Sequence, residues 1–245
     1  MWIIELLPVT YAILFALYEW VAGRRLKTRL TSHHINKRTI YWQSIAFLWL
    51  GVLLTGLYVM AGFANWRDLG VPVTWQLSYL AEIAVILLAG AALYYQHVRS
   101  LRSAAARQSL KKMFTPYKWF LPENKREQRL FIYGVSVSAG VCEELLFRGF
   151  LLYYLSPLTG TPGAVIISSA LFGLCHAYQG NIYIVRTAVL GIGLCLLYLL
   201  TDSLILVTGL HILIDVSSGH LAYQVLSFPA GANARRHLRK PGQIS

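Results

Sequence analysis

Residues 140–150 place two adjacent carboxylates and an arginine inside an apolar run. The stretch reads Gly-Val-Cys-Glu-Glu-Leu-Leu-Phe-Arg-Gly-Phe, and its charged residues are Glu143, Glu144 and Arg148. An ionised side chain at the centre of a bilayer costs about 2.5 to 3.5 kcal/mol on insertion scales, so such residues usually mark functional sites. Glu144 and Arg148 are spaced to share one helical face and form a charge pair. This pairing leaves Glu143 available for chemistry.

Two later apolar segments carry histidines at the same spacing. Phe172 and His176 are predicted to lie on one face of a helix, and so are His211 and Asp215. Hydrocarbon holds no water that could satisfy these polar groups separately. Three helices with polar residues are therefore expected to bring them together at one site inside a bundle.

Two carboxylates and two imidazoles support two kinds of hydrolysis. In the first, a glutamate takes a proton from water, one histidine orients that water, and the other donates a hydrogen bond to the oxyanion. In the second, His176 and His211 join a carboxylate as zinc ligands, and metal-bound water is the nucleophile. No cofactor is predicted, and zinc stays open as an alternative.

The composition indicates a polytopic membrane protein. The 245-residue chain is 56% hydrophobic and 13% charged, whereas soluble domains are about 25% charged, and its mean hydropathy is +0.53. Runs of about 20 apolar residues can each cross a hydrocarbon core about 30 Å thick. We expect an all-α transmembrane bundle of about seven spanning helices, at residues 2–21, 40–63, 76–97, 130–155, 163–178, 182–200 and 204–226.

The positive charges predict the orientation of the bundle. Of the 22 Lys and Arg residues, all but three fall in residues 24–38, in residues 99–129 or in the tail after Pro229. Seven crossings put these stretches on one side, which the positive-inside rule makes cytoplasmic. The N-terminus is then outside and the C-terminus cytoplasmic. This placement explains the net charge of +12 by the lipid bilayer, without a nucleic-acid partner.

We expect one transmembrane domain over residues 1–228. Residues 98–129 mix basic and aromatic side chains, which is typical of an amphipathic segment on the cytoplasmic membrane surface. Residues 229–245 are predicted to form a basic flexible tail.

Several residues outside the motifs are interpreted as structural. Glu5 and Glu19 lie near the ends of the first helix, where a carboxylate can reach the membrane interface. Glu82 is predicted to be a hydrogen-bonded packing contact. The three cysteines lack C-x-x-C spacing and are predicted to be small buried hydrophobes, namely Cys142, Cys175 and Cys195.

Together the three motifs resemble the signatures of the CAAX protease and bacteriocin-processing family, whose members are glutamate-type intramembrane endopeptidases and include the CAAX-box prenyl protease. The resemblance covers residues 130–226 and rests on three motifs in this order: Glu143-Glu144-x-x-x-Arg148, Phe172-x-x-x-His176 and His211-x-x-x-Asp215.

The resemblance implies a role for each motif residue. Glu143 would activate water together with His176, while Glu144 and Arg148 would form a supporting pair. His211 and residue 215 would form the oxyanion site. The CAAX-box protease has Asn where this chain has Asp215, and an ionised Asp cannot donate a hydrogen bond to an oxyanion. Asp215 is therefore expected to orient His211 or to be protonated.

The implied function is hydrolysis of a peptide bond in a membrane-associated substrate, by a multi-pass protein of a bacterial inner membrane. A non-catalytic scaffold or bacteriocin-immunity protein of the same fold is one alternative. An ion-coupled transporter is another, and the lack of a two-fold sequence repeat disfavours it. Other intramembrane proteases are disfavoured because the chain has no H-E-x-x-H, G-x-S-G or G-x-G-D motif.

The expected depths of Glu143 and His176 in the membrane differ, and this restricts how the two residues can meet. At 1.5 Å per residue, Glu143 would lie about 20 Å from the start of its helix, whereas His176 is close to a turn at Gly180. We expect this turn to be sunk into the protein, where irregular backbone is tolerated if it lines a water-filled cavity.

Overall fold

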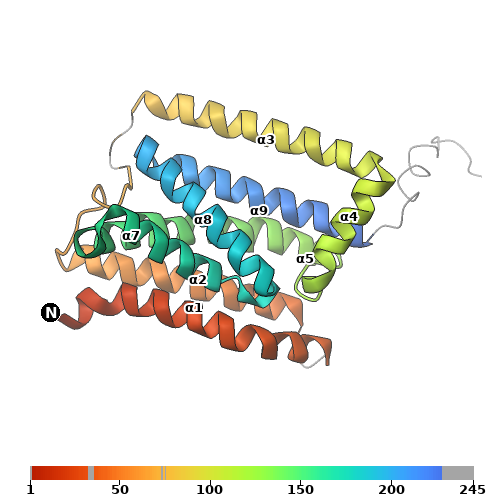
Figure 1. The fold of residues 1–245 in the computed structure, drawn as a ribbon, viewed down its shortest axis with the longest axis horizontal. Coiled ribbons are helices and arrows are strands. Elements are labelled where there is room, and N and C mark those ends of the chain that lie inside the picture. Colours follow the sequence, from red (N-terminus) through yellow and green to blue (C-terminus); the bar gives the residue numbers. More distant parts are fainter. Residues whose placement is uncertain (1, 33–35, 73, 75, 228–245) are drawn as a thin grey trace, which may run out of the picture.

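The computed structural model describes residues 2–32, 36–72, 74 and 76–227, and this part of the chain contains helices and no strand. The predicted tail, residues 229–245, lies outside the described residues. The all-α bundle is thereby confirmed (Figure 1). Its elements in chain order are α1 (Trp2–Thr31), α2 (Lys37–Met60), α3 (Ser78–Arg102), α4 (Ala104–Phe114), η1 (Thr115–Tyr117), α5 (Lys125–Arg129), η2 (Leu130–Ser136), α6 (Val137–Glu144), η3 (Leu145–Leu151), α7 (Leu152–Leu174), η4 (Ala177–Gln179), α8 (Asn181–Thr201) and α9 (Leu204–Ser227).

The number of spanning helices depends on how one long segment is counted. Among the described residues, six helical segments are long and apolar enough to cross a membrane, and one of them is Lys125–Leu174. Gly160 breaks this segment between Pro157 and Pro162, because its φ of 72° is not helical. The chain turns back there, as Figure 1 shows for α7. The predicted count of about seven is consistent with this arrangement.

The helices that carry the motifs pack closely together. α6 packs against α9 and α2, while α7 packs against α8. At Gly140 in α6, an added Cβ would lie 3.1 Å from the backbone nitrogen of Ile212 in α9. Glycine therefore permits the close approach that brings Glu143 and Glu144 against the helix of His211.

The segment after α3 packs on the bundle. Phe114, Trp119, Phe120 and Leu121 are all buried, and the Tyr41 hydroxyl donates a hydrogen bond to the Phe120 carbonyl at 2.6 Å. The interpretation that the aromatic residues of this stretch lie on a lipid surface is therefore wrong for these side chains. They form part of the protein core.

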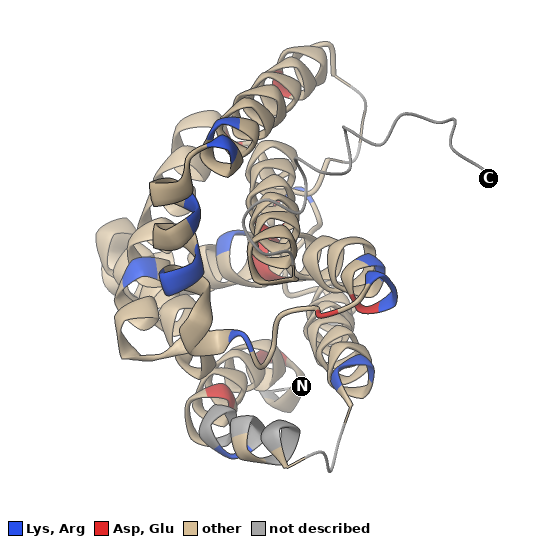
Figure 2. Cartoon of the chain, turned by 90° about the vertical axis from the view of Figure 1, so that its right-hand side faces the viewer, with Lys and Arg blue, Asp and Glu red and all other residues tan. Residues whose placement is uncertain are grey.

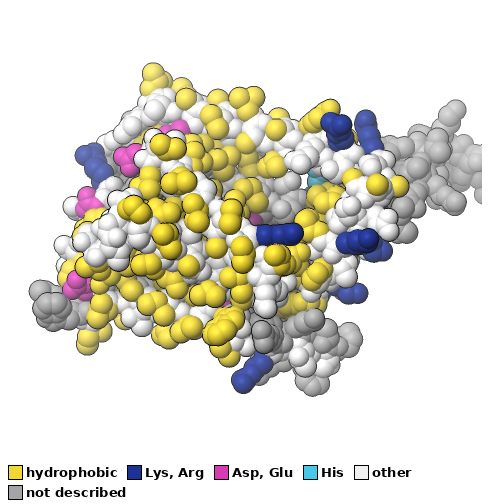
Figure 3. All heavy atoms as spheres, in the orientation of Figure 1, with side chains coloured by type: hydrophobic (Ala, Val, Ile, Leu, Met, Phe, Trp, Pro, Cys, Tyr) yellow, Lys and Arg dark blue, Asp and Glu magenta, His cyan; other side chains and the backbone are white. Residues whose placement is uncertain are grey.

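The surface has the charge pattern of a membrane protein. In Figure 3, hydrophobic side chains cover the middle of the visible face, while Lys and Arg gather at the end that carries α4. Figure 2 looks onto that end and shows Lys and Arg on several of its helices. Most of the visible Asp and Glu in Figure 3 lie toward the opposite end. The protein is thus an integral multi-pass membrane protein, and its orientation remains a prediction.

Two structural interpretations are confirmed. Glu82 accepts a hydrogen bond from the Ser203 hydroxyl at 2.5 Å, which ties α3 to the start of α9. The three cysteines are buried free thiols.

Candidate active site

Glu144 and Arg148 form an ion pair at the centre of the bundle. Arg148 Nη1 donates to Glu144 Oε1 at 2.8 Å, and both side chains have no exposed surface. Arg148 Nη2 also donates to the Gly191 carbonyl at 3.3 Å, and the guanidinium lies 4.3 Å from the centroid of the Phe172 ring. Arg148 belongs to η3, a π-helical stretch of the kind that often occurs at functional sites. The pair therefore joins η3 to α7 and α8.

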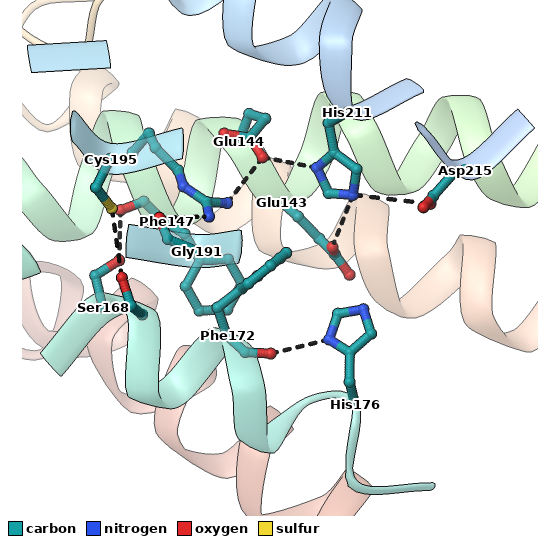
Figure 4. A network of polar contacts seen from close by, with 12 residues as sticks. Glu143, Glu144, Phe147, Ser168, Phe172, His176, Gly191, Cys195, His211 and Asp215 are labelled. Atoms are coloured by element: carbon teal, nitrogen blue, oxygen red, sulfur yellow. Dashed lines mark hydrogen bonds and ion pairs between the residues drawn. The ribbon is translucent and has the colours of Figure 1, made fainter. Parts of the chain in front are cut away.

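His211 reaches this pair from α9. Its Nδ1 lies 2.6 Å from Glu144 Oε1, and because an ionised carboxylate only accepts, Nδ1–H is the donor. The other ring nitrogen, Nε2, lies 3.7 Å from Glu143 Oε2 and 3.7 Å from Asp215 Oδ2. Glu144 thus orients the ring, and Nε2 faces the two remaining carboxylates (Figure 4).

His176 lies in a turn, not in a helix. The predicted helix over residues 163–178 is wrong in its last turn, because α7 ends at Leu174 and His176 has φ −101° and ψ 12°. His176 nevertheless lies next to Phe172, with ring centroids 5.0 Å apart.

The tautomer of His176 follows from its hydrogen bond. Nδ1 lies 2.9 Å from the Phe172 carbonyl oxygen, which can only accept, so Nδ1–H donates and Nε2 carries the lone pair in the neutral ring. Burial lowers the pKa of His176 to about 4. The imidazole is therefore neutral at pH 7 and can accept a proton at Nε2.

One cavity is lined by the motif side chains that take no part in the Glu144–Arg148 ion pair. It has a volume of about 240 Å³, and its wall includes Glu143, His176, His211 and Asp215. Tyr178 and Gln179 of the following turn also line it, so this turn contributes to the cavity as expected. Figure 4 shows the Glu143 carboxyl group between the two imidazoles. Glu143 Oε2 is buried and has no hydrogen-bond partner within the described part of the chain.

The structure thus brings all six predicted site residues together, in two roles. Glu144 and Arg148 are paired with each other and lie away from the cavity wall, whereas the other four line it. Unpaired buried carboxylate oxygens are rare in proteins and need an explanation. An oxygen that faces a cavity next to two imidazoles can bind and deprotonate a water molecule.

The cavity wall also contains residues that the motifs do not include. α1 contributes Phe15 and Glu19, and the segment after α3 contributes Phe114, Tyr117 and Phe120. The half-buried side chain of Glu19 faces this cavity, and its position at the membrane interface stays a prediction. Phe15 and Glu19 share one helical face, and this spacing was the available signal.

A metal centre would need a different arrangement of side chains. Among the described residues, no group of three or more His, Cys, Asp or Glu side chains is placed to hold a metal ion. His176 and His211, the ligands in the zinc alternative, each have Nδ1 hydrogen-bonded to a protein oxygen. Only Nε2 of each ring is therefore free to face the cavity.

Comparison with known proteins supports the resemblance of the motifs. Residues 125–217 match the family described as Type II CAAX prenyl endopeptidase Rce1-like. This range includes all six site residues and confirms the family resemblance that the three motifs indicate. Comparisons with curated proteins and with solved structures give no match. The family match points to a protease.

Proposed function

We propose that this chain, whose residues 125–217 match the Rce1-like family, is an intramembrane endopeptidase that activates water with Glu143 and His176. The substrate is a membrane-associated peptide or protein, and the membrane is the inner membrane of a bacterium. The observation that carries the proposal is the buried Oε2 of Glu143, which has no hydrogen-bond partner within the described part of the chain and faces the cavity beside the two imidazoles.

The first step is attack of water on the scissile carbonyl. Water held between Glu143 Oε2 and His176 Nε2 loses a proton to Glu143 while its oxygen bonds to the carbonyl carbon. His176 is suited to orient this water, because its Nδ1–H is occupied by the Phe172 carbonyl and its Nε2 accepts. No covalent acyl-enzyme is formed.

The second step is collapse of the tetrahedral intermediate. When Nε2 of His211 carries a proton, it can donate a hydrogen bond to the oxyanion, and such preorganised donors stabilise the transition state. Asp215, whose Oδ2 lies 3.7 Å from Nε2, would hold this ring in place. The C–N bond then breaks, and the leaving amine takes the proton that Glu143 removed from water.

Glu144 and Arg148 act only as positioning residues in this scheme. Glu144 Oε1 accepts from both His211 Nδ1 and Arg148 Nη1, which fixes the tautomer and angle of the His211 ring. Carboxylates that orient imidazoles in this way are a common part of hydrolytic sites.

The test is cleavage of labelled, membrane-anchored peptides by the purified protein in lipid, with Glu143→Gln as the variant. Because Gln keeps the shape but cannot take a proton, we expect a loss of at least about 100-fold in rate with unchanged folding. Glu5→Gln, which alters α1 away from the cavity wall, is the control and should keep full activity.

A strong zinc chelator separates the two mechanisms. Activity that survives the chelator and is lost in Glu143→Gln supports the glutamate mechanism. Activity that the chelator removes and zinc restores assigns His176 and His211 to a metal. Full activity of Glu143→Gln would show that Glu143 is not the base, and peptide binding without cleavage in the unmodified protein would favour the scaffold or immunity function.

A further inference from the structure

Apart from the imidazoles, the ionisable groups in the cavity wall are mainly carboxylates. Three carboxylates line the cavity, namely Glu19, Glu143 and Asp215, and no Lys or Arg is among the described residues that line it. Glu143 and Asp215 each lie 3.7 Å from His211 Nε2. Glu19 has no such cationic neighbour among the described side chains.

Glu19 comes from a helix outside the three motifs, but it lines the same cavity as the catalytic groups. Burial, then Glu143, then Glu19 raise the pKa of the Cys175 thiol. Burial also raises the pKa of Tyr178, and Glu19, Asp215 and Glu143 raise it further. α1 also packs against η4, the turn that follows His176, so Glu19 and His176 belong to the same region of the cavity.

A carboxylate in a membrane-embedded cavity is costly unless a cation or water satisfies it. The cavity wall that includes Glu19 also contains aromatic rings, among them Phe15, Phe120 and Tyr178. Such a wall suits a long basic side chain, whose aliphatic stem packs on apolar surface while its charged end meets the carboxylate. A substrate carboxylate would instead meet three acidic groups and be repelled.

We propose that Glu19 is a specificity-determining residue that binds a Lys or Arg side chain of the substrate close to the scissile bond. This inference rests on the proposed endopeptidase function. It gives the α1 helix, which lies outside the family match, a direct role in choosing the substrate. Glu19 takes no part in the proton transfers of the reaction.

The experiment uses the full-length protein in lipid nanodiscs and sets of acyl-anchored fluorogenic peptides. Within a set, one position near the cleavage site carries Lys, Gln or Glu, and the position is moved along the peptide. At one position we expect kcat/KM to be about tenfold higher for Lys than for Gln, as for one charge-assisted hydrogen bond.

Three variants test the role of the carboxylate. Glu19→Gln should abolish the preference for Lys and leave kcat/KM for the Gln peptide within about twofold, whereas Glu19→Lys should shift the preference to the Glu peptide. Glu5→Gln, on the same helix but not in the cavity wall, should behave as the unmodified protein. Equal preference in the unmodified protein, or an unchanged preference in Glu19→Gln, would overturn the proposal.

Peptide binding separates this proposal from the proposed reaction. Dissociation constants are measured for the same peptides on protein that carries Glu143→Gln, with and without Glu19→Gln. Binding that prefers Lys and depends on Glu19, without any cleavage by the unmodified protein, would refute the endopeptidase and retain the basic-residue site. Cleavage without any dependence on Glu19 would retain the endopeptidase and overturn the site.

Discussion

Replacing Arg148 alone should destabilise the protein more than replacing the whole ion pair. Arg148 and Glu144 have no exposed surface, and Arg148 donates to Glu144 at 2.8 Å. In Arg148→Met the Glu144 carboxylate stays buried with only His211 Nδ1–H as a partner. Breaking a buried pair in this way typically costs about 3 to 5 kcal/mol in the free energy of unfolding.

The double variant Arg148→Met with Glu144→Gln isolates the cause. Gln is neutral, and its carbonyl oxygen can still accept from His211 Nδ1–H, so no uncompensated charge is buried. We expect the double variant to be more stable than Arg148→Met, with a coupling free energy of about 1 to 3 kcal/mol between the two positions.

The free energy of unfolding is measured by reversible denaturation in mixed micelles, followed by far-UV circular dichroism. The four proteins of the cycle are the unmodified chain, the two single variants and the double variant. A cost below about 1 kcal/mol for Arg148→Met, or strictly additive effects, would refute the reasoning, because the pair would then behave as solvated surface charges do.

Two other substitutions test the packing and the protonation of the site. Gly140→Ala should lower the cleavage rate about tenfold or more, because its Cβ would push α6 away from Ile212 and a small misplacement of catalytic groups is costly. The matched control is Gly193→Ala, whose Cβ would meet nothing within 4 Å, and it should stay active. The pKa of His176 is about 4 in the folded state, below its ordinary value of 6.5. The unfolded chain therefore binds the proton at a higher pH than the folded protein does, and the protein should lose stability as pH falls from about 6.5 to 4. The loss over this window, measured as the free energy of unfolding against pH, should be smaller in His176→Gln, and equal slopes would contradict the buried neutral ring.

Hydropathy was sufficient to predict the spanning segments, because a helix in lipid must be apolar along its whole length. It could not place the end of α7. Residues 163–178 are mostly apolar, and the helix stops at Leu174 because of the tight turn that leads to Gly180, whose φ is 121°. A four-residue difference in the end of a helix leaves no mark in a hydropathy pattern.

The three motifs predicted which residues meet, because helical spacing and the cost of buried charge both restrict the possibilities. The spacing also predicted that Glu144 pairs with Arg148, which leaves Glu143 free. It could not show that Glu144 also holds His211, because that contact joins residues from α6 and α9 across the bundle. Contacts of this kind follow from the packing at Gly140, which no periodicity reveals.

Composition alone cannot place the aromatic residues of the segment after α3, because it does not distinguish lipid from a protein interior. Both environments favour apolar side chains, and basic neighbours are found at either. The structure resolves the choice, since Phe114 and Phe120 are buried and line the cavity that holds Glu143.

The cavity joins two parts of the chain that differ in what they contribute. The groups proposed for chemistry all lie in residues 125–217, which match a protease family, whereas another part of the wall comes from α1 and from the segment after α3. Changes in that wall, such as those at Glu19, can alter which peptide binds without disturbing the hydrogen bonds of His176 or His211. A protein built in this way can change its substrate through the part of its sequence that has no recognisable motif, and this explains why the motifs predict a reaction but not a substrate.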